Sequence, residues 1–490
     1  MGLLDIIIFL PVIGAIVLVC WPHPAEKLVK IFAAVVTAVP LALTVYLYNA
    51  FNHTAGMQFE TKLAWIPAIN AFYHVGVDGI SLPLVLLMSL LGFLVVLISW
   101  KIHDRVREYF IWLLVLETAV LGVFSSLDLL LFFIFWEIVL IPMYFLISIW
   151  GTGHRKYSAF KYVVYTLAGS AFMLAGILAL YFTTGSLNML EIQELIPAAS
   201  AAIPLTAIFF LLMVGFAVKL PIFPLHTWLP DAHTDAPTGV SVILAGTLLK
   251  MGGYGIIRLG VSIFPDIAQR YAPLFIILAV IGVLYGAAVT LRQTDLKRLI
   301  AYSSISHMGY VLLGIFALND LSLTGAVTQM VSHGLVTGLL FAVAGLVLHN
   351  VGERDLRLLG GLAGRIPVIA VVFIIGGLAS LGLPLTSGFA AEFLVFVGSF
   401  ASTAVAGIKV YTLLAAAGVV LAAGYILWMV QRAFYGPLPE RFRQIKDADK
   451  REMLYMFILV GLIILIGIYP AILTDVIRTG IWPVASLFMP

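Results

Sequence analysis

The 490-residue sequence has almost no cysteine, since Cys20 is its only thiol. A single thiol can form neither an intrachain disulfide nor a cysteine-ligated zinc or iron–sulphur site. The sequence also lacks a Walker motif and a GxGxxG segment after a strand, the short patterns that bind phosphates. We therefore expect no cofactor and no metal in this chain, and any redox chemistry would belong to partner proteins.

Charged residues are also scarce. They make up 10% of the chain, and hydrophobic residues make up 62%, whereas a soluble domain is about one quarter charged. The net charge of +3 is too small to favour nucleic acid as a partner. This composition is typical of a chain embedded in a lipid bilayer.

No removable signal peptide is expected. The segment from Met1 to Trp21 is apolar from its start, carries Asp5 in place of a basic region, and has no small-residue cleavage site after it. We interpret it as the first membrane span.

About fourteen apolar stretches are long enough to cross a hydrocarbon core of about 30 Å. They lie near residues 3–20, 30–49, 78–100, 109–127, 128–150, 159–183, 203–228, 239–259, 272–291, 299–318, 323–349, 367–395, 410–434 and 453–473. No loop between them is long enough for a folded domain. The predicted fold class is all-α: a single polytopic membrane domain, residues 1–490.

Basic residues alternate between the two sides of this topology. Twenty of the 27 lysines and arginines fall in loops that share one side, five fall on the other side, and Lys219 and Lys250 lie inside spans. By the positive-inside rule the basic loops face the cytoplasm, and both termini lie outside.

Two spans contain residues that interrupt a helix. The seventh reads LMVGFAVKLPIFPLHTW, and the twelfth reads LASLGLPLTSGFAAEF. Broken helices at corresponding places in two halves are typical of inverted-repeat transporters. We therefore expect one five-helix repeat over 109–260 (helices 4–8) and a second over 272–434 (helices 9–13), flanked by 1–108 (helices 1–3) and 435–490 (helix 14).

Five spans carry an ionisable residue near the middle, where an unneutralised charge costs at least a few kcal/mol. These residues are Glu137, Lys219, Lys250, His333 and Glu392. One such group alone could be structural and neutralised by a partner across a helix interface. Two lysines and two glutamates at similar depth favour proton transfer between them.

Glu117 and His307 are two further candidates. Glu117 lies in a short span and could reach the interface, so structural and functional roles are equally open. His307, in AYSSISHMGY, could bridge two waters in a proton relay.

The loop segment PLHTWLPDAHTDAP holds His226, His233, Asp231 and Asp235. The spacing of seven between the histidines and the intervening prolines argue against zinc. A charged loop cap or an entry funnel for protons is the preferred interpretation.

Six motifs resemble those of the antiporter-like, proton-pumping membrane subunits of respiratory complex I, the NADH–quinone oxidoreductase. They are FFIFWE, VKLPIFPLHTWLPDAH, ILAGTLLKMGGYGIIR, LKRLIAYSSISHMG, QMVSHGL and SGFAAEF, in order over residues 130–395. The resemblance implies an electron-transfer complex that drives protons across the membrane. It also implies roles in proton transfer for Glu137, Lys219, Lys250, His307, His333 and Glu392, the first two as an interacting pair and Glu392 as the outlet.

Within this family the sequence is most similar to the branch called subunit M or chain 4, which has a glutamate at the position of Glu392. The sister subunit L has a lysine there and a long C-terminal lateral helix, and this sequence has neither. Asp235 stands where a glutamate is more usual, which puts the role of its loop in slight doubt.

The resemblance further implies subunits L and N as neighbours, FMN and iron–sulphur clusters in partner subunits, and a bacterial-type inner (plasma) membrane. The alternative is a Mrp-type sodium/proton antiporter subunit, which shares the glutamate and the lysine of the broken helix. The spelling of the HTWLPDAH loop favours complex I. A free-standing solute transporter would need a recognition pocket that the sequence does not reveal.

Overall fold

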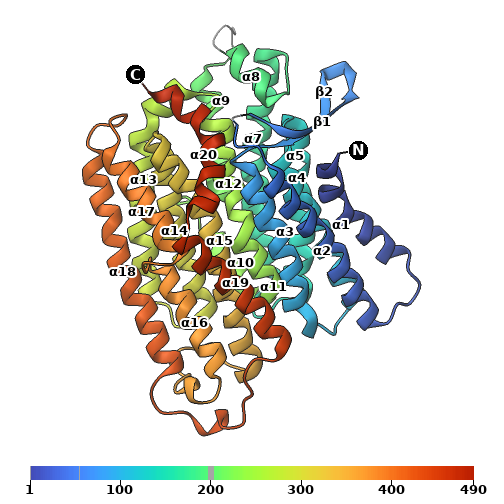
Figure 1. Ribbon diagram of the computed structural model, residues 1–490, viewed down its shortest axis with the longest axis vertical. Helices are drawn as coiled ribbons and strands as arrows, with labels where there is room; N and C mark the ends of the chain where they lie inside the picture. Colours follow the sequence, from blue (N-terminus) through green and yellow to red (C-terminus); the bar gives the residue numbers. More distant parts are fainter. Residues whose placement is uncertain (1, 55, 197–202, 490) are drawn as a thin grey trace.

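The computed structural model describes residues 2–54, 56–196 and 203–489, which form a bundle of membrane-length helices (Figure 1). The elements of the first half are α1 (Leu3–Cys20), α2 (Glu26–Ala50), β1 (Gln58–Ile66), η1 (Pro67–Ile69), β2 (Ala71–Val77), α3 (Ser81–Ile98), η2 (Ser99–Lys101), α4 (Val106–Ser125), α5 (Leu129–Ile138), α6 (Leu140–Trp150), α7 (Arg155–Thr184) and α8 (Met189–Leu195).

The elements of the second half are α9 (Leu205–Lys219), α10 (Trp228–Asp235), α11 (Thr238–Ile243), η4 (Leu244–Leu248), α12 (Leu249–Gly255), η5 (Ile256–Val261), α13 (Pro265–Leu291), α14 (Leu296–Phe316), α15 (Asp320–Val351), η6 (Leu362–Gly364), α16 (Pro367–Ser380), α17 (Ser387–Ala401), α18 (Ile408–Phe434), η7 (Glu440–Phe442), α19 (Lys450–Ile468), α20 (Ala471–Ala485) and η8 (Ser486–Phe488). The expected all-α polytopic fold is confirmed.

Thirteen helices in the described ranges are long and apolar enough to cross a membrane. We expected about fourteen spans. The seventh and twelfth are not among the thirteen because each is divided into shorter helices, and α20, which we did not predict, is among them. α20 follows α19 after a break at Tyr469 and Pro470.

Both predicted helix breaks are present. The seventh span consists of α9, which ends at Lys219, and α10, which begins at Trp228. The twelfth consists of α16 and α17, joined by a turn in which Gly382 has φ +76°. A side chain rarely adopts this left-handed backbone conformation, so glycine is the residue that fits there.

The eighth span has an irregularity that the sequence did not predict. Two π-helical segments, η4 and η5, flank the short α-helix α12, which carries Lys250. Such segments add a residue to one turn and are frequent at functional sites.

The long loop between α2 and α3 forms a small antiparallel hairpin, an exception to the all-α expectation. β1 pairs with β2, and Lys62 lies opposite His74. The chain reverses at η1, which ends at Asn70 with φ +52°.

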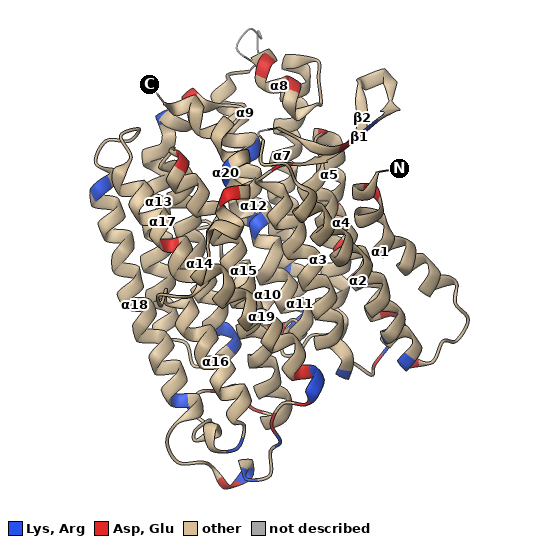
Figure 2. Ribbon diagram, in the orientation of Figure 1, with Lys and Arg blue, Asp and Glu red and all other residues tan. Residues whose placement is uncertain are grey.

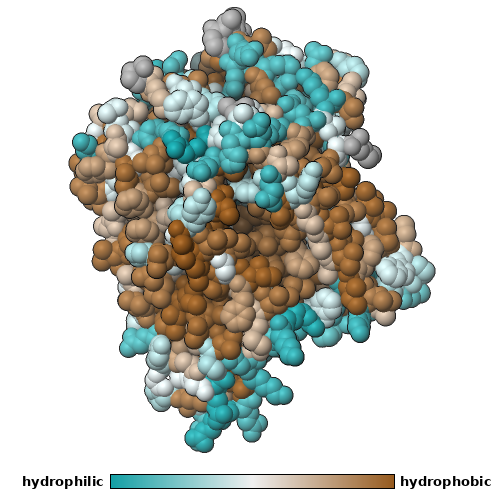
Figure 3. All heavy atoms as spheres, viewed as in Figure 1, coloured by the Kyte–Doolittle hydropathy of each residue, from teal (hydrophilic) through white to brown (hydrophobic). Residues whose placement is uncertain are grey.

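The central helices α12, α14 and α15 are almost wholly buried, whereas α1, α2 and α18 expose many apolar side chains. Figure 3 shows a hydrophobic band around the middle of the molecule, with hydrophilic residues at both ends. The two chain ends lie toward the same end of the bundle (Figure 1), and most Lys and Arg segments lie toward the other (Figure 2). This distribution is that of a multi-pass membrane protein.

Candidate functional site

Four of the buried ionisable residues form a line, in which two links are close polar contacts and the middle one is a wider separation between two imidazoles. The Lys250 ammonium lies 2.8 Å from Nδ1 of His333. The ring of His333 lies 5.6 Å from that of His307, centroid to centroid. Nδ1 of His307 lies 3.3 Å from a carboxylate oxygen of Glu392. The line therefore crosses from α12 through α15 and α14 to α17.

The backbone around Lys250 holds its ammonium in place. The residue is fully buried, and its Nζ donates a hydrogen bond to the carbonyl of Ala245 in the π segment η4. Close packing fixes the opposite side of α12, since a Cβ on Gly252 would lie 2.5 Å from the backbone nitrogen of Leu220. Lys250 thus has one backbone partner and one titratable partner.

The break between α16 and α17 positions Glu392. Its carboxylate packs against Gly382, where a Cβ would come within 2.7 Å of Oε2. Ser380, the last residue of α16, lies 3.1 Å from Nε2 of His307. The break therefore supplies both the space for the carboxylate and a hydroxyl for the neighbouring imidazole.

A small cavity adjoins this line. Its lining includes His307, His333 and Glu392 together with Gln329 and Thr337, and it leaves ≈ 10 Å³ open to the centre of a water molecule. Nε2 of His333 and Oε1 of Gln329 have no hydrogen-bond partner among the described residues. A polar cavity of about this size holds a single water with several partners.

Glu137 and Lys219 lie near each other without a direct ion pair. In the described part of the chain no ion pair within 4.0 Å joins the two side chains, and Lys219 lies beside Trp136, the residue that precedes Glu137. The Lys219 ammonium instead lies 3.2 Å from the hydroxyl of Tyr162 on α7, and 5.4 Å above the ring of Trp136. An aromatic cage thus surrounds the lysine beside the glutamate.

The two groups of residues are adjacent at the packed contact of α9 with α12. Leu220, next to Lys219, touches Gly252, two residues from Lys250. No hydrogen bond connects the two ammonium groups through side chains that the structure describes. The sequence-predicted residues therefore form a pair and a line, placed side by side.

Glu117 lies off this line. Its carboxyl group is buried against Gly92 of α3, where a Cβ would lie 2.7 Å from the carboxyl carbon. Neither oxygen has a hydrogen-bond partner among the described residues. Among the described residues no hydrogen bond or ion pair links it to the other candidates.

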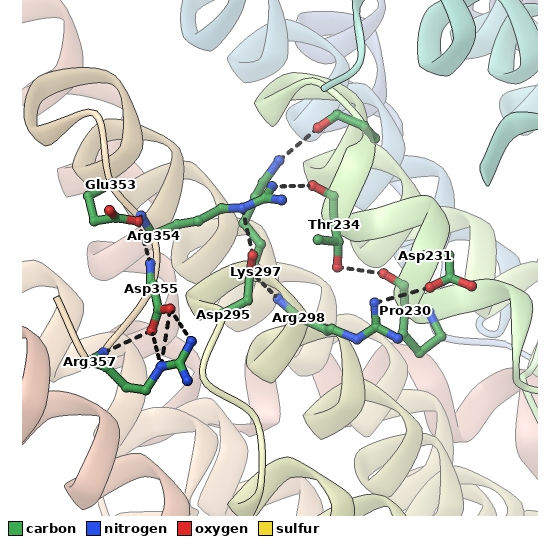
Figure 4. Close-up of polar contacts among 11 residues, drawn as sticks. Pro230, Asp231, Thr234, Asp295, Lys297, Arg298, Glu353, Arg354, Asp355 and Arg357 are labelled. Carbon is green, nitrogen blue, oxygen red and sulfur yellow. Dashed lines mark hydrogen bonds and ion pairs between the residues drawn. The ribbon is translucent and has the colours of Figure 1, made fainter. Parts of the chain in front are cut away.

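The acidic residues of α10, a segment that we expected to be a loop, hold helices together. Asp231 pairs with Lys161 at 2.7 Å and with Arg298 at 3.2 Å. Figure 4 shows the neighbouring contacts, in which Lys297 donates to a backbone carbonyl of this segment and Arg354 pairs with Asp295. These ion pairs fasten α10 to α7 and α14, so the charged cap that we expected is present, but Asp231 provides it from a helix and not from a loop.

The two loop histidines do not share a site. His233 is fully buried and stacks on Phe341 at 4.8 Å between ring centroids, whereas His226 stacks on Phe223. Within the described residues no three His, Cys, Asp or Glu side chains are grouped closely enough to hold a metal ion.

Sequence reasoning missed Tyr162, Ser380 and Thr337, which lie beside Lys219, His307 and His333 respectively. A lone hydroxyl in an apolar helix gives no local signal, because most such groups bond to their own backbone.

The fold and the buried line define a class: antiporter-like membrane subunits that hold titratable residues at bilayer depth. A family model described as NADH:quinone oxidoreductase/Mrp antiporter, TM, matches residues 126–418. The chain belongs to this family, in the branch called subunit M or chain 4.

Curated relatives match the chain over nearly its whole length. It is 40% identical to NADH-quinone oxidoreductase subunit M of Rhodobacter capsulatus, covering 98% of this chain and 96% of the relative. It is 40% identical to NADH-ubiquinone oxidoreductase chain 4 of Chondrus crispus, covering 94% and 93%. It is 37% identical to F(420)H(2) dehydrogenase subunit M of Methanosarcina mazei, covering 99% and 98%.

Solved structures share the fold. A chain of respiratory complex I from Thermus thermophilus with bound NADH superimposes with a TM-score of 0.88 at 28% identity, covering 99% of this chain and 100% of that one. A chain of the Mrp complex from Dietzia sp. DQ12-45-1b gives a TM-score of 0.86 at 19% identity, covering 99% and 97%. At that identity the likeness to Mrp concerns the fold alone.

Proposed function

We propose that this chain is the proton-translocating, antiporter-like subunit M of an NADH–quinone oxidoreductase, and that protons cross it through Lys250, His333, His307 and Glu392. Electron transfer in partner subunits provides the energy. The observation that carries the proposal is the line of titratable groups, two of whose three links are within 3.3 Å.

Each residue has a role that its surroundings support. Lys250 receives the proton, the two imidazoles pass it on, and Glu392 beside the helix break releases it toward the outside. The remaining gap, between the two imidazoles, adjoins the small cavity, where one water could complete the hydrogen bonds.

Glu137 and Lys219 form the control element of the mechanism. Unit charges roughly 4 Å apart interact by about 4 kcal/mol at an effective dielectric constant of 20, and charges somewhat farther apart by less. A change of charge on Glu137 would therefore alter the proton occupancy of Lys219 by about a hundredfold. Because α9 packs on α12, the altered charge acts on the adjacent Lys250.

Two isolated β-bridges support the inverted repeats proposed for 109–260 and 272–434. Asp128 caps α5 and bridges to Asn188, and Asp295 caps α14 and bridges to Asp355. The two pairs occupy equivalent positions in helices 4–8 and 9–13. The basic loops place the second pair on the inner side and the first on the outer side, as an inverted repeat requires.

The basic loops face the cytoplasm in this proposal, so both termini lie outside a bacterial-type inner membrane. Subunits L and N are the expected neighbours. FMN and iron–sulphur clusters belong to partner subunits, since this chain offers neither the thiols nor a phosphate-binding loop.

The test is Lys219→Ala in the assembled complex, reconstituted into liposomes. We expect proton pumping to fall at least tenfold, because the control element is lost. Lys62→Ala is the matched control, since Lys62 is exposed and pairs with Glu191 at the surface. Wild-type pumping in Lys219→Ala would refute the proposal, and sodium-dependent proton exchange without an electron donor would support the Mrp-type alternative.

A further inference from the structure

A charged cavity lies at the inner ends of three helices, away from the proton line. Its volume is ≈ 140 Å³, and it is lined mainly by the end of α3 with η2, the end of α15 and the start of α19, with Tyr109 and residues 237–239 completing the lining. Its polar lining includes Lys101, His349, Asp449, Arg451 and Glu452. The basic loops place this end of the helices at the cytoplasmic headgroup level.

The carboxylates of the cavity are already engaged within the protein. Asp449 caps α19 by accepting hydrogen bonds from the backbone of Arg451 and Glu452. Glu452 pairs with Lys101 at 2.6 Å. Arg451 has no carboxylate within 4.0 Å among the described residues, and its guanidinium lies 4.4 Å above the ring of Trp100. The uncommitted charge of the cavity is therefore positive.

A second cavity, of ≈ 120 Å³, lies deeper on the same three helices. Leu87 and Leu90 of α3, Leu335 of α15, and Leu462 and Leu465 of α19 contribute to its lining, which is apolar apart from the hydroxyl of Tyr48. Figure 3 views this face of the molecule, where the surface over the middle of α3 and α19 is mostly hydrophobic. Such a cavity excludes water and accepts hydrocarbon.

The two cavities are separated by one leaflet of a bilayer. The nearest lining residues of the two cavities lie seven positions apart on α15 and on α19, and Arg451 lies eleven positions from Leu462, which is roughly 16 Å at 1.5 Å per residue. Half of a hydrocarbon core of about 30 Å has the same depth.

We propose that the seam formed by α3, α15 and α19 binds one anionic phospholipid of the inner leaflet. Its phosphate pairs with Arg451 in the inner cavity, and one acyl chain runs along the seam into the apolar cavity. The site shares no residue with the proton line, so it stands independently of the proposed proton path.

The test uses the assembled complex, delipidated in detergent and titrated with phosphatidylglycerol. Native mass spectrometry that releases this subunit counts the lipid it retains. We expect one lipid on the wild type, and Arg451→Gln to weaken its binding by about fivefold, the effect of one basic residue at a membrane surface. Leu462→Trp, which fills the apolar cavity and leaves the charges unchanged, should weaken it at least as much.

Arg432→Gln is the matched control. Arg432 also stacks on a tryptophan at the inner end of a helix, 3.7 Å above Trp428, but lines neither cavity. Equal retention by all variants would overturn the proposal, and so would equal loss in Arg432→Gln. If inorganic phosphate displaced the lipid and Leu462→Trp had no effect, the cavity would be a site for a free anion and the proposal would be wrong. A helix of a neighbouring subunit that filled the seam in the assembled complex would also overturn it.

Discussion

His333 is the residue on which the proposed proton line depends most directly, and His333→Gln tests it. Glutamine keeps a side-chain oxygen that can accept a hydrogen bond from Lys250, but it cannot carry a proton at neutral pH. No hydrogen bond joins Lys250 to His307 in the described structure, and the two imidazole centroids are 5.6 Å apart. Among the described residues, His333 is the titratable side chain that lies between Lys250 and His307, and the substitution removes it.

The size of the effect follows from the step that is lost. Proton transfer by a positioned side chain contributes a factor of about 10² to 10⁴ to a rate. We expect proton pumping by His333→Gln to fall about a hundredfold, which corresponds to roughly 2.7 kcal/mol of barrier. Water in the enlarged space would keep the loss at the lower end of that range.

The assay follows acidification or alkalinisation inside liposomes that contain the assembled complex, with its electron donor supplied and quinone reduction recorded in parallel. Thr328→Val is the matched control, because Thr328 is buried on the same helix and its hydroxyl bonds only to Thr324 of that helix. Pumping by His333→Gln within about twofold of the wild type, in a fully assembled complex, would refute the role of His333 as a relay.

Three further substitutions test the surroundings of the line. Tyr162→Phe removes the hydroxyl beside Lys219 and should lower the free energy of unfolding by about 1–3 kcal/mol, measured by thermal unfolding of the purified complex. Gly382→Ala should reduce pumping about tenfold or more, because a Cβ would come 2.7 Å from Oε2 of Glu392 at a position with φ +76°. Glu117→Gln should leave the pumping rate within about twofold of the wild type, since Glu117 contacts no member of the line.

Each of these has an outcome that contradicts it. An unchanged unfolding midpoint for Tyr162→Phe would mean that the hydroxyl does not stabilise the buried ammonium. Gly364→Ala serves as control for Gly382→Ala, because a Cβ at Gly364 would meet nothing within 4 Å. If both substitutions reduced pumping equally, the loss in Gly382→Ala could not be ascribed to its contact with Glu392. Loss of pumping in Glu117→Gln would place a second proton path through α4.

The sequence was sufficient to predict features that arise from local chemistry. Prolines and glycines within apolar runs predicted the breaks at α9/α10 and α16/α17, because proline removes a backbone donor and blocks the helix. Hydrophobic length predicted the spans, and the rarity of charges at bilayer depth singled out the candidate residues.

The connections among those residues could not be predicted in the same way. Lys250 and His333 meet although 83 residues separate them, and this contact depends on how α12 and α15 pack. Tyr162 lies beside Lys219 for the same reason. The π segments around Lys250 and the hairpin of β1 and β2 also lacked a recognisable local pattern, since apolar side chains occur in all of these conformations.

The carbonyl of Ala245 has a consequence for how Lys250 hands on its proton. A protonated lysine donates one hydrogen bond to that carbonyl and another to Nδ1 of His333. When the second proton moves to the imidazole, the neutral amine still donates to Ala245 and its lone pair now accepts from the ring. The bond between the two residues reverses its polarity while every heavy atom stays in place. In the proposed proton path, the π turn would make this step a proton hop without side-chain motion, and slower movements would belong to other steps.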